Sequence, residues 1–387
     1  MPSLLAVCTL PPWPTLNGYS LRVSHLLEHL SAQWPITLIA PPLDAVPPAI
    51  VRHVPISLPA SGVTYPWRFD QTGLRATLDR IVAETRIDRA LVFPGAEALW
   101  FGRTDLPPAV VDIIDCNPLE FWRGLLSYRD LRQRYRALRE ICVATRYARR
   151  TVRSYAATVC AGEADARWLR RIGGRDVVHM IANGVEVPSR IGPESSRPTL
   201  IFTGALDYQP NIEAVHFAVK AIWPRVVAAR PDARFVIAGR HPVPSVRTLS
   251  SRTNVEIVAN VPDMTQVLGE SWVAIAPMCS GVGMKNKVLE AWACARPVVM
   301  SRLATNGLHI PSDHASLVGM SPGDMAKAVL RLLSDATERR RLGRSARDNA
   351  LSYTWAAAAA RLDVLLRHAV RKERHDGRSS PTSSASQ

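Results

Sequence analysis

The sequence predicts an α/β protein with two similar domains, each built on a parallel β-sheet and separated from the other by a cleft. Short apolar runs alternate with helix-like segments along residues 1–181, and strands that alternate with helices form parallel sheets. The alternation stops in segment 187–198, which has the composition of a linker, and then starts again. The length of 387 residues also exceeds what one ordinary core requires.

The first half contains buried strands and long helices in alternation. The apolar runs that predict strands are 4–10, 36–40, 90–93, 110–114, 157–161 and, more weakly, 177–181. The segments that predict helices are 20–33, 73–85 and 119–155, the last as one or two helices. We therefore expect a first domain at residues 1–187.

The second half repeats the pattern. The expected strands are 199–203, 235–238, 255–258, 273–276 and 298–300, and the expected helices are 211–229, 264–270, 287–294, 323–334 and 337–349. These elements predict a second domain at residues 188–353. A last helix is expected at 354–370, and the Ser-, Arg- and Pro-rich tail 371–387 is expected to be disordered.

The most informative segment is the glycine-rich, doubly basic loop at 280–287, which leads into a short helix. Gly281 and Gly283 allow close approach of the backbone to a ligand. Lys285 and Lys287 lie beside a helix N-terminus, which already favours an anion. A nucleotide diphosphate suits this arrangement, with Glu290 facing the ribose hydroxyls. The alternative is an ordinary strand–helix turn whose lysines are merely solvated.

Other candidate residues follow strands of the second domain, where open α/β sheets bind their ligands. Gly204 ends the first of these strands, and Arg240 follows the second, where it would grip a diphosphate bidentately. Segment 261–263 follows the third. The alternatives are a surface ion pair for Arg240 and helix N-cap roles for Asp207 and Asp263.

In the first domain the candidates also follow strands. Gly18 lies in the loop after the first strand, and Arg22 and His25 follow one helical turn apart, where either would touch a substrate. A lone histidine is more often structural, so His25 has that alternative. Glu97 and Asp115 each follow a later strand, and each is a candidate to face an acceptor.

Composition restricts the class of protein. The chain is 47% hydrophobic and 21% charged, which is typical of a globular protein, and it contains no apolar run of the ~20 residues that span a bilayer. The N-terminus lacks a basic leader region and predicts a first strand instead of a signal peptide. The six cysteines form no CxxC pair, which fits a reducing cytoplasm and argues against structural zinc.

The net charge of +15 indicates an anionic partner, and much of it lies in one segment. Segment 123–153 carries ten arginines, opposed only by Asp130 and Glu140, on a helical apolar pattern. One interpretation is attraction to anionic lipid headgroups. The other is an ordinary solvated face. The ten residues are Arg123, Arg129, Arg132, Arg134, Arg136, Arg139, Arg146, Arg149, Arg150 and Arg153.

Six segments carry a pattern that can be compared with known families. They are Asn17-Gly18 with Arg22, Asn183-Gly184-Val185, 202–206, 239–242, 287–291 with 297–299, and 352–355. Together they resemble the GT-B glycosyltransferases, particularly the large retaining family 4 and its bacterial polysaccharide-assembly branch. The resemblance covers about residues 1–370 and is stronger in the C-terminal half.

The resemblance implies two Rossmann-like domains facing across a cleft, with the last helix crossing back to the first domain. It implies that Lys285, Lys287 and Arg240 stabilise a leaving diphosphate without a metal or other cofactor, while Glu290 holds the ribose. Of the implied donor-binding residues, Lys287, Arg240 and Glu290 are the catalytic candidates. The donor-binding set is Gly204, Leu206, Arg240, Val261, Pro262, Gly281, Gly283, Met284, Lys285, Asn286, Lys287, Leu289 and Glu290. The acceptor-side set is Asn17, Gly18, Arg22, Glu97 and Asp115.

Three positions depart from the family pattern. Val282 stands where the family has the first glutamate of an E-x7-E element that ends at Glu290. Ala295 replaces the glycine usual before the Pro-Val-Val strand. The loop 94–97 contains no histidine, although many members carry a catalytically important one there.

The resemblance implies a retaining transfer of sugar from a UDP- or GDP-sugar to a glycan or lipid-linked acceptor. We expect a cytoplasmic protein, peripheral on the inner face of the cell membrane, with no nucleic-acid partner. One alternative is a nucleotide-sugar epimerase of the same fold, which the scarcity of acid and base side chains disfavours. Another is a catalytically degenerate binding protein for nucleic acid or membrane, which Val282 and the net charge favour. No nucleic-acid-binding motif supports that alternative.

Overall fold

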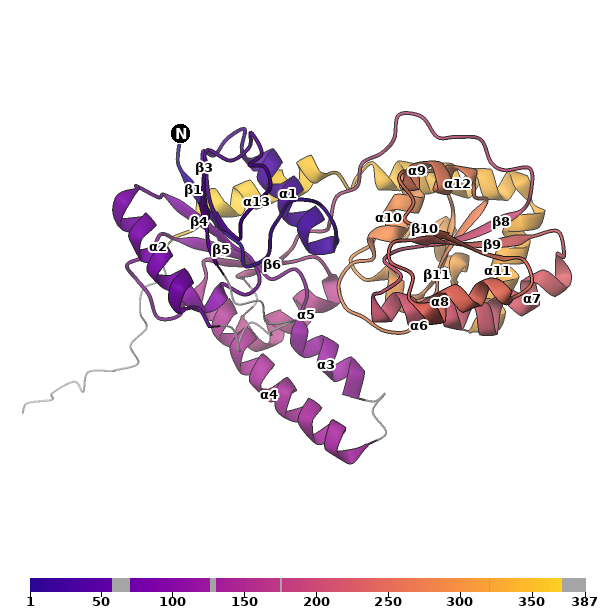
Figure 1. The fold of residues 1–387 in the computed structure, drawn as a ribbon, viewed down its shortest axis with the longest axis horizontal. Coiled ribbons are helices and arrows are strands. Elements are labelled where there is room, and N and C mark those ends of the chain that lie inside the picture. The colour runs from indigo at the N-terminus through magenta and orange to yellow at the C-terminus, as the bar shows by residue number, and fades with distance from the viewer. Residues whose placement is uncertain (58–69, 126–129, 175, 320, 371–387) are drawn as a thin grey trace, which may run out of the picture.

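The computed structural model describes residues 1–57, 70–125, 130–174, 176–319 and 321–370. The predicted disordered tail, 371–387, lies outside the described residues. The described part contains two parallel β-sheets with helices packed on both faces, one on each side of the predicted linker (Figure 1). The predicted α/β class is therefore confirmed.

The first sheet has seven parallel strands in the order β3-β2-β1-β4-β5-β6-β7. Six of them were predicted, with ends that differ by a few residues. The edge strand β3 was not predicted, because among its residues only Val54 is buried and Pro55 ends it. The strands are β1 (Leu4–Val7), β2 (Ile36–Ala40), β3 (Arg52–Pro55), β4 (Arg89–Val92), β5 (Ala109–Asp112), β6 (Ala157–Cys160) and β7 (Val178–Met180).

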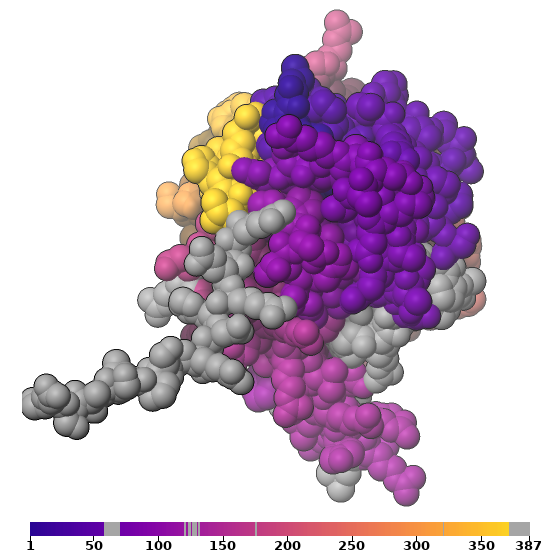
Figure 2. Space-filling model, turned by 90° about the vertical axis from the view of Figure 1, so that its left-hand side faces the viewer, coloured from indigo at the N-terminus to yellow at the C-terminus, as the bar shows by residue number. Residues whose placement is uncertain are grey.

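Helices cover this sheet on both faces. The predicted helical segment 119–155 is two helices, α3 and α4, which project away from the sheet as a pair (Figures 1 and 2). Asp130 begins the second of them by accepting a hydrogen bond from the Arg132 N–H (3.0 Å). Helix α5 and a short 3₁₀ turn, η2, were not predicted. The elements are α1 (Gly18–Leu30), α2 (Thr72–Glu84), η2 (Glu97–Trp100), α3 (Asn117–Leu125), α4 (Leu131–Ser154) and α5 (Glu163–Gly173).

The second sheet has six parallel strands in the order β10-β9-β8-β11-β12-β13. Five were predicted. The sixth, β13, has only two residues, too few to give a sequence pattern. The strands are β8 (Thr199–Thr203), β9 (Arg234–Gly239), β10 (Val255–Ala259), β11 (Val273–Ala276), β12 (Val298–Ser301) and β13 (Val318–Gly319).

The helices of the second domain match most of the predicted segments. The predicted helix 211–229 is interrupted by a π-helical turn, η3, just before Pro224, which has no N–H to continue an α-helical ladder. The elements are α6 (Gln209–Phe217), η3 (Ala218–Ile222), α7 (Trp223–Ala229), α8 (Pro244–Arg247), η4 (Thr248–Ser251), α9 (Met264–Glu270), α10 (Asn286–Ala293), η5 (Arg302–Thr305), η6 (Ser312–Leu317), α11 (Pro322–Ser334) and α12 (Ala336–Ala350).

The last helix, α13 (Trp355–His368), leaves the second domain and packs against α1 of the first. Leu362 and Leu366 are fully buried in the first-domain core. Asp363 accepts a hydrogen bond from the Trp34 indole (2.7 Å), and the Trp355 ring stacks on His25 at 4.9 Å. The predicted crossing is confirmed, and His25 takes the structural role that was its alternative.

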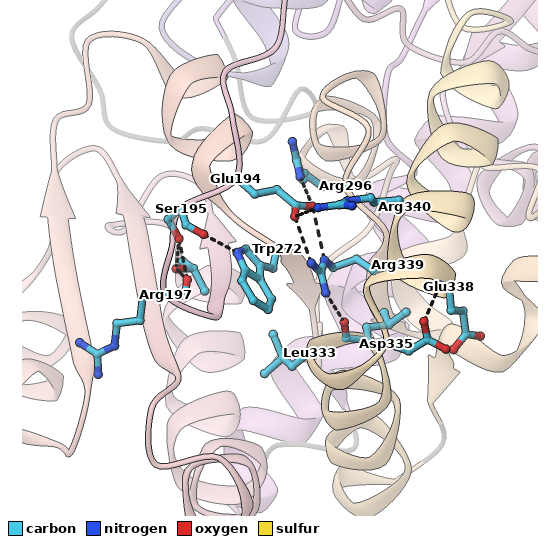
Figure 3. A network of polar contacts seen from close by, with 12 residues as sticks. Glu194, Ser195, Arg197, Trp272, Arg296, Leu333, Asp335, Glu338, Arg339 and Arg340 are labelled. Carbon is cyan, nitrogen blue, oxygen red and sulfur yellow. Dashed lines mark hydrogen bonds and ion pairs between the residues drawn. The ribbon is translucent and has the colours of Figure 1, made fainter.

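The carboxylate of Glu194 is one of the groups that hold the predicted linker on the second domain (Figure 3). Glu194 accepts hydrogen bonds from Arg296 (2.9 Å) and from Arg339 (3.0 and 3.3 Å). The Arg339 guanidinium also lies 4.1 Å from the centre of the Trp272 ring. These contacts fix the linker at Glu194 to α12, which carries Arg339, and to the turn before β12, which carries Arg296.

Candidate functional site

A cavity of about 980 Å³ lies between the two domains. Its first-domain wall is formed by the loops after β1, β4 and β5 and by α4, and its second-domain wall by the loops after β8, β9 and β11 and by the start of α10. All of these loops leave the carboxyl ends of their strands. The cavity therefore occupies the place where α/β sheets bind ligands.

Two glycines bring the second-domain backbone close to this cavity. Gly204 has φ 147°, and a Cβ atom there would lie 2.8 Å from Asn211 Nδ2 and 3.1 Å from Lys287 Nζ. A Cβ atom on Gly239 would lie 1.7 Å from the Gly204 carbonyl oxygen. Only glycine fits at either position. The structure shows that Gly204 packs against Asn211 and Lys287, and the predicted approach of its backbone to a ligand stays a prediction.

Lys287 lies at the centre of the second-domain wall. Its ammonium group donates a hydrogen bond to Asn211 Oδ1 (2.6 Å) and lies 3.9 Å from the centre of the Phe202 ring. Burial, with a smaller contribution from the Lys285 charge, lowers the pKa of Lys287 to about 7. A ligand anion would raise this pKa again, so the group is arranged to gain charge when an anion binds.

Glu290 lies one turn further along α10 and lines the same cavity. Burial raises the pKa of this carboxyl, and the Lys287 and Arg240 charges partly offset that effect. Arg240 also lines the cavity, and its guanidinium donates a hydrogen bond to the backbone carbonyl of Leu16 in the first domain. Arg240 thus contacts both walls, and its alternative interpretation as a surface ion pair does not describe this contact.

The first lysine of the basic loop, Lys285, binds the backbone of the loop itself. Lys285 is 9% exposed and donates to the carbonyl oxygens of Val282 (2.5 Å) and Gly283 (3.2 Å). Gly283 has φ 68°, and a Cβ atom there would lie 1.8 Å from Asp115 Oδ1 of the first domain. Gly281 has φ 95° and packs against Pro210. The two lysines of this segment therefore have different partners. Lys285 binds the backbone of its own loop, whereas Lys287 binds the side chain of Asn211.

The first-domain wall carries the predicted acceptor-side residues, with one exception. Asn17 caps α1 by accepting from the Ser20 N–H (2.9 Å), and Gly18, Glu97 and Asp115 all line the cavity. Arg22 is fully buried and pairs with the equally buried Asp112, Nε to Oδ2 2.8 Å. Its side chain belongs to the interior of the first domain instead of the cavity wall.

Glu97 is only 3% exposed although it lines the cavity. Its Oε2 accepts hydrogen bonds from the Gly95 N–H (2.7 Å) and the Tyr147 hydroxyl (3.1 Å). Burial raises its pKa to about 7, and these hydrogen bonds oppose the rise. A carboxyl that titrates near neutrality therefore lies in the loop where the family pattern has a histidine.

The remaining predicted residues differ in position. Met284 and Asn286 line the cavity with Lys285, Lys287 and Glu290. Leu206 and Leu289 are fully buried in the second-domain core, so they support the wall from behind. Val261 and Pro262 lie in the loop after β10. Asp263, which follows them, caps α9 by accepting from the Thr265 N–H (2.8 Å), as its alternative predicted.

Several residues of the site were not predicted. Asn211 holds Lys287, and Tyr147 on α4 holds Glu97. Asn183 was noted only as part of a motif, yet it bonds across the domains to Asn286 (2.7 Å). Asn306 also reaches across the domains, donating to Asp165 Oδ2 (3.0 Å). An Asn or Tyr that bonds a distant residue leaves no periodic signal in a sequence.

The described residues contain neither a candidate metal site nor a candidate membrane-spanning helix. Within residues 1–57, 70–125, 130–174, 176–319 and 321–370, no three His, Cys, Asp or Glu side chains are grouped so as to hold a metal ion. The same residues include no helix with both the length and the apolar character to cross a bilayer.

Residues 197–335 match the family model of the glycosyl transferases group 1. Over 91 residues the chain is 34% identical to the D-inositol 3-phosphate glycosyltransferase of Corynebacterium glutamicum (strain R). This match spans 23% of the chain and 22% of that protein's length. The family match lies within the second domain, and the chain covers about a fifth of the length of that relative.

The structural comparisons cover nearly the whole chain. WaaG, a glycosyltransferase involved in lipopolysaccharide biosynthesis, superposes with a TM-score of 0.68 and 11% identity, over 94% of this chain and 100% of WaaG. HepE of Anabaena, crystallised with UDP and glucose, superposes with a TM-score of 0.67 and 10% identity, over 95% and 100%. The chain has the GT-B fold. TarM gives a TM-score of 0.60 at 14% identity, over 77% of this chain and 58% of TarM.

The GT-B fold places the two walls of the cavity on separate Rossmann-like domains, as the structure shows. The segment that matches the group 1 model, 197–335, contains the second-domain wall, including Gly204, Arg240 and Lys287. The predicted GT-B fold is therefore confirmed, and the match of residues 197–335 to the glycosyl transferases group 1 agrees with the predicted resemblance to GT-B glycosyltransferases.

Proposed function

We propose that this protein is a retaining glycosyltransferase that moves a sugar from a nucleotide-sugar donor to a glycan or lipid-linked acceptor. The second-domain wall would bind the donor and the first-domain wall the acceptor. The observation that carries the proposal is the convergence of Lys287, Arg240 and Glu290 on one interdomain cavity. The match of residues 197–335 to the group 1 glycosyl transferases supports it.

Electrostatics favour a diphosphate at the second-domain wall. The ammonium of Lys287 and the guanidinium of Arg240 lie beside the N-terminus of α10, whose free N–H groups and dipole also attract anions. These groups are in place before the leaving diphosphate develops its charge, so they stabilise the transition state without reorganisation. We propose that Glu290 holds the ribose hydroxyls, and that the transfer needs no metal ion.

The first experiment is thermal stabilisation by UDP-, GDP-, TDP- and ADP-sugars. A ligand that binds the native state raises its melting temperature by mass action. We expect a UDP- or GDP-sugar to stabilise the wild type, and Lys287→Ala to lose the shift. Lys327→Ala is the matched control, because Lys327 is an exposed lysine on α11, on the same domain. Absence of any shift in the wild type would contradict the proposal.

The stereochemistry and metal dependence need separate measurements. The reaction is run with the donor identified above and a saccharide acceptor. We expect the NMR signal of the anomeric proton to show that the first product keeps the anomeric configuration of the donor sugar. Excess EDTA is expected to leave the rate unchanged. An inverted product would contradict retention, and a rate restored only by added Mg²⁺ or Mn²⁺ would contradict the metal-independent transfer. A sugar with one inverted ring carbon, formed from the donor without any acceptor, would instead favour the epimerase alternative.

The projecting pair α3–α4 supports a peripheral position on an anionic membrane (Figures 1 and 2). Trp122, Tyr135 and Leu138 expose 58%, 72% and 46% of their surface, beside exposed arginines of α4. Exposed aromatic and apolar side chains among cations suit a headgroup layer. The side chains of Arg123 and Arg129 lie outside the described residues. An acceptor carried by a lipid would meet the cavity from this side, because α4 also lines it.

Vesicle sedimentation tests this position. We expect binding to vesicles with phosphatidylglycerol, weaker binding at high salt, and little binding to neutral vesicles. The triple variant Arg132→Gln, Arg136→Gln, Arg139→Gln should lose most of it. The matched control removes three exposed arginines elsewhere: Arg252→Gln, Arg344→Gln and Arg361→Gln. If both triple variants lost vesicle binding equally, the binding would depend only on the net charge of the protein. That result would contradict the proposed membrane face.

A further inference from the structure

A buried chain of hydrogen bonds runs from the core of the first domain to the cavity. Asp112 and Arg22 form an ion pair in which neither side chain is exposed, Nε to Oδ2 2.8 Å. Arg22 Nη1 donates to Asn183 Oδ1 (2.6 Å), and Asn183 Nδ2 donates to Asn286 Oδ1 (2.7 Å) across the domain boundary. Asn286 is the first residue of α10 and lines the cavity.

The direction of every bond in this chain is fixed by chemistry. A guanidinium has donors only, so the Asn183 atom that faces Arg22 must be the amide oxygen. The Asn183 NH₂ group is then the one that faces Asn286, whose oxygen must accept. The NH₂ group of Asn286 is left to the cavity. Among the residues that the structure describes, none accepts a hydrogen bond from it.

The chain is costly, which argues against stability as its purpose. A buried ion pair contributes little net stability, because both ions lose their hydration. Within the described part of the chain, Arg22 Nη2 is also buried without a hydrogen-bond partner. Replacement of a buried ion pair by apolar side chains of similar volume is often neutral or stabilising. The guanidinium charge of Arg22 instead fixes the direction, from donor to acceptor, of each hydrogen bond in the chain. Two neutral amides alone could form the bond between them in either direction.

We propose that Asn286 donates its NH₂ group to a diphosphate oxygen of the bound nucleotide, and that Arg22 is a positioning residue that sets this direction through Asn183. The inference rests on the proposed nucleotide-sugar site. The neighbouring Lys287 and the N-terminus of α10 favour an anion at this place, and an amide NH₂ group would add a directed hydrogen bond to it.

The proposal has a direct chemical test. A carboxylate at position 183 still accepts from Arg22, but it has no NH₂ group to donate. In Asn183→Asp, Asn286 should therefore rotate its amide to donate to the new carboxylate, and it would then present its oxygen to the cavity. The affinity for UDP and GDP, measured by calorimetry, is expected to fall about tenfold or more.

A double-mutant cycle separates this effect from simple charge or packing changes. Asn286→Ala alone should lower the affinity about tenfold, because the donor is lost. Asn183→Asp in the Asn286→Ala background should then cost much less than it does in the wild type, because no amide remains to rotate. Equal costs in both backgrounds, or an unchanged affinity in Asn286→Ala, would overturn the proposal.

A second variant covers the case in which Asn183→Asp does not fold. Asn286→Asp keeps the acceptor for the Asn183 NH₂ group, so the buried chain is retained, but a carboxylate replaces the donor in the cavity. We expect a larger loss of UDP and GDP affinity than in Asn286→Ala. An equal or smaller loss would overturn the inference.

The same experiment distinguishes the two proposals. A wild type that binds neither UDP nor GDP would overturn the proposed function and this inference with it. Wild-type binding that neither Asn286→Ala nor Asn183→Asp weakens would overturn this inference alone.

Discussion

The ammonium group of Lys287 lies 3.9 Å from the centre of the Phe202 ring, at the carboxyl end of the first strand of the second sheet. An aromatic face attracts a cation, and Asn211 Oδ1 accepts a hydrogen bond from the same group. Burial nevertheless lowers the pKa of Lys287 to about 7. The side chain is therefore held in place by neutral partners and is available to an anionic ligand.

This arrangement predicts a pH-dependent affinity for UDP or GDP. Above the pKa of about 7, free Lys287 is mostly neutral and must take up a proton when it pairs with a diphosphate. The affinity is therefore expected to fall as the pH rises from 7 to 9, by up to about tenfold per unit. Isothermal titration at several pH values measures it.

Lys287→Arg is the control for that prediction, because arginine stays charged throughout this range. Its affinity should change little between pH 7 and 9, and the affinity of Lys287→Ala should be low and flat. A slope in Lys287→Arg as steep as in the wild type would assign the titration to another group.

The packing of Gly239, at the end of β9, against the loop after β8 predicts a strong effect of a single methyl group. In Gly239→Ala the new Cβ would lie 1.7 Å from the Gly204 carbonyl oxygen, so two backbone segments must separate. We expect a loss of more than about 3 kcal/mol in the free energy of unfolding, or no folded protein. Urea denaturation measures it.

Gly73→Ala is the matched control for this glycine. Gly73 lies in α2, and a Cβ atom there has no neighbour within 4 Å. Alanine is favoured over glycine in a helix by roughly 1 kcal/mol, so this variant should be slightly more stable than the wild type. Similar stabilities of the two variants would contradict the backbone contact.

Much of the fold follows from residues near one another in sequence. Apolar runs such as 36–40 and 199–203 give strands with the predicted bounds, because buried parallel strands are apolar on both faces. Segment 52–55 does not, because an edge strand buries few of its side chains. Asp263 as a helix cap was likewise predictable, because a cap depends on residues two or three positions away.

The site was predicted in part, because the loops that follow parallel strands can be located from local sequence patterns. The loop 280–287 and α10 supply several lining residues from adjacent positions. Arg22 was expected to face the cleft, but its partner Asp112 lies 90 positions away in the chain, and their pairing turns the side chain into the core. Tyr147 and Glu97 meet for the same reason across 50 positions. Long-range polar contacts depend on tertiary structure, which local patterns do not contain.

The linker contact in Figure 3 predicts that Glu194 stabilises the protein. Burial alone would raise its pKa, but the hydrogen bond from Arg339 and the charges of Arg296 and Arg340 outweigh this and lower it. Glu194→Gln leaves two buried guanidiniums without their carboxylate, and should cost about 3 kcal/mol in the free energy of unfolding. Denaturant titration at pH 7 measures it.

Glu256→Gln is the control, because Glu256 pairs with Arg234 at a more exposed position and such pairs contribute about 1 kcal/mol or less. Because the pKa of Glu194 is lowered in the folded state, its contribution is present above the unfolded pKa. It is lost as the pH falls through the folded pKa. Equal stabilities of the two variants would contradict this role of Glu194.

Glu97 has the opposite sign of pH dependence. Its pKa is raised from 4.5 to about 7 by burial, so between these values the folded protein binds more protons than the unfolded chain. The stability that Glu97 contributes is complete below pH 4.5 and falls as the pH rises through 7, by up to about 3 kcal/mol. Glu97→Gln cannot titrate. The stability of the wild type minus that of Glu97→Gln should therefore decrease from pH 5 to pH 8, as urea denaturation would show. A constant difference would mean that Glu97 is already ionised in the folded protein at pH 5, and would contradict the raised pKa.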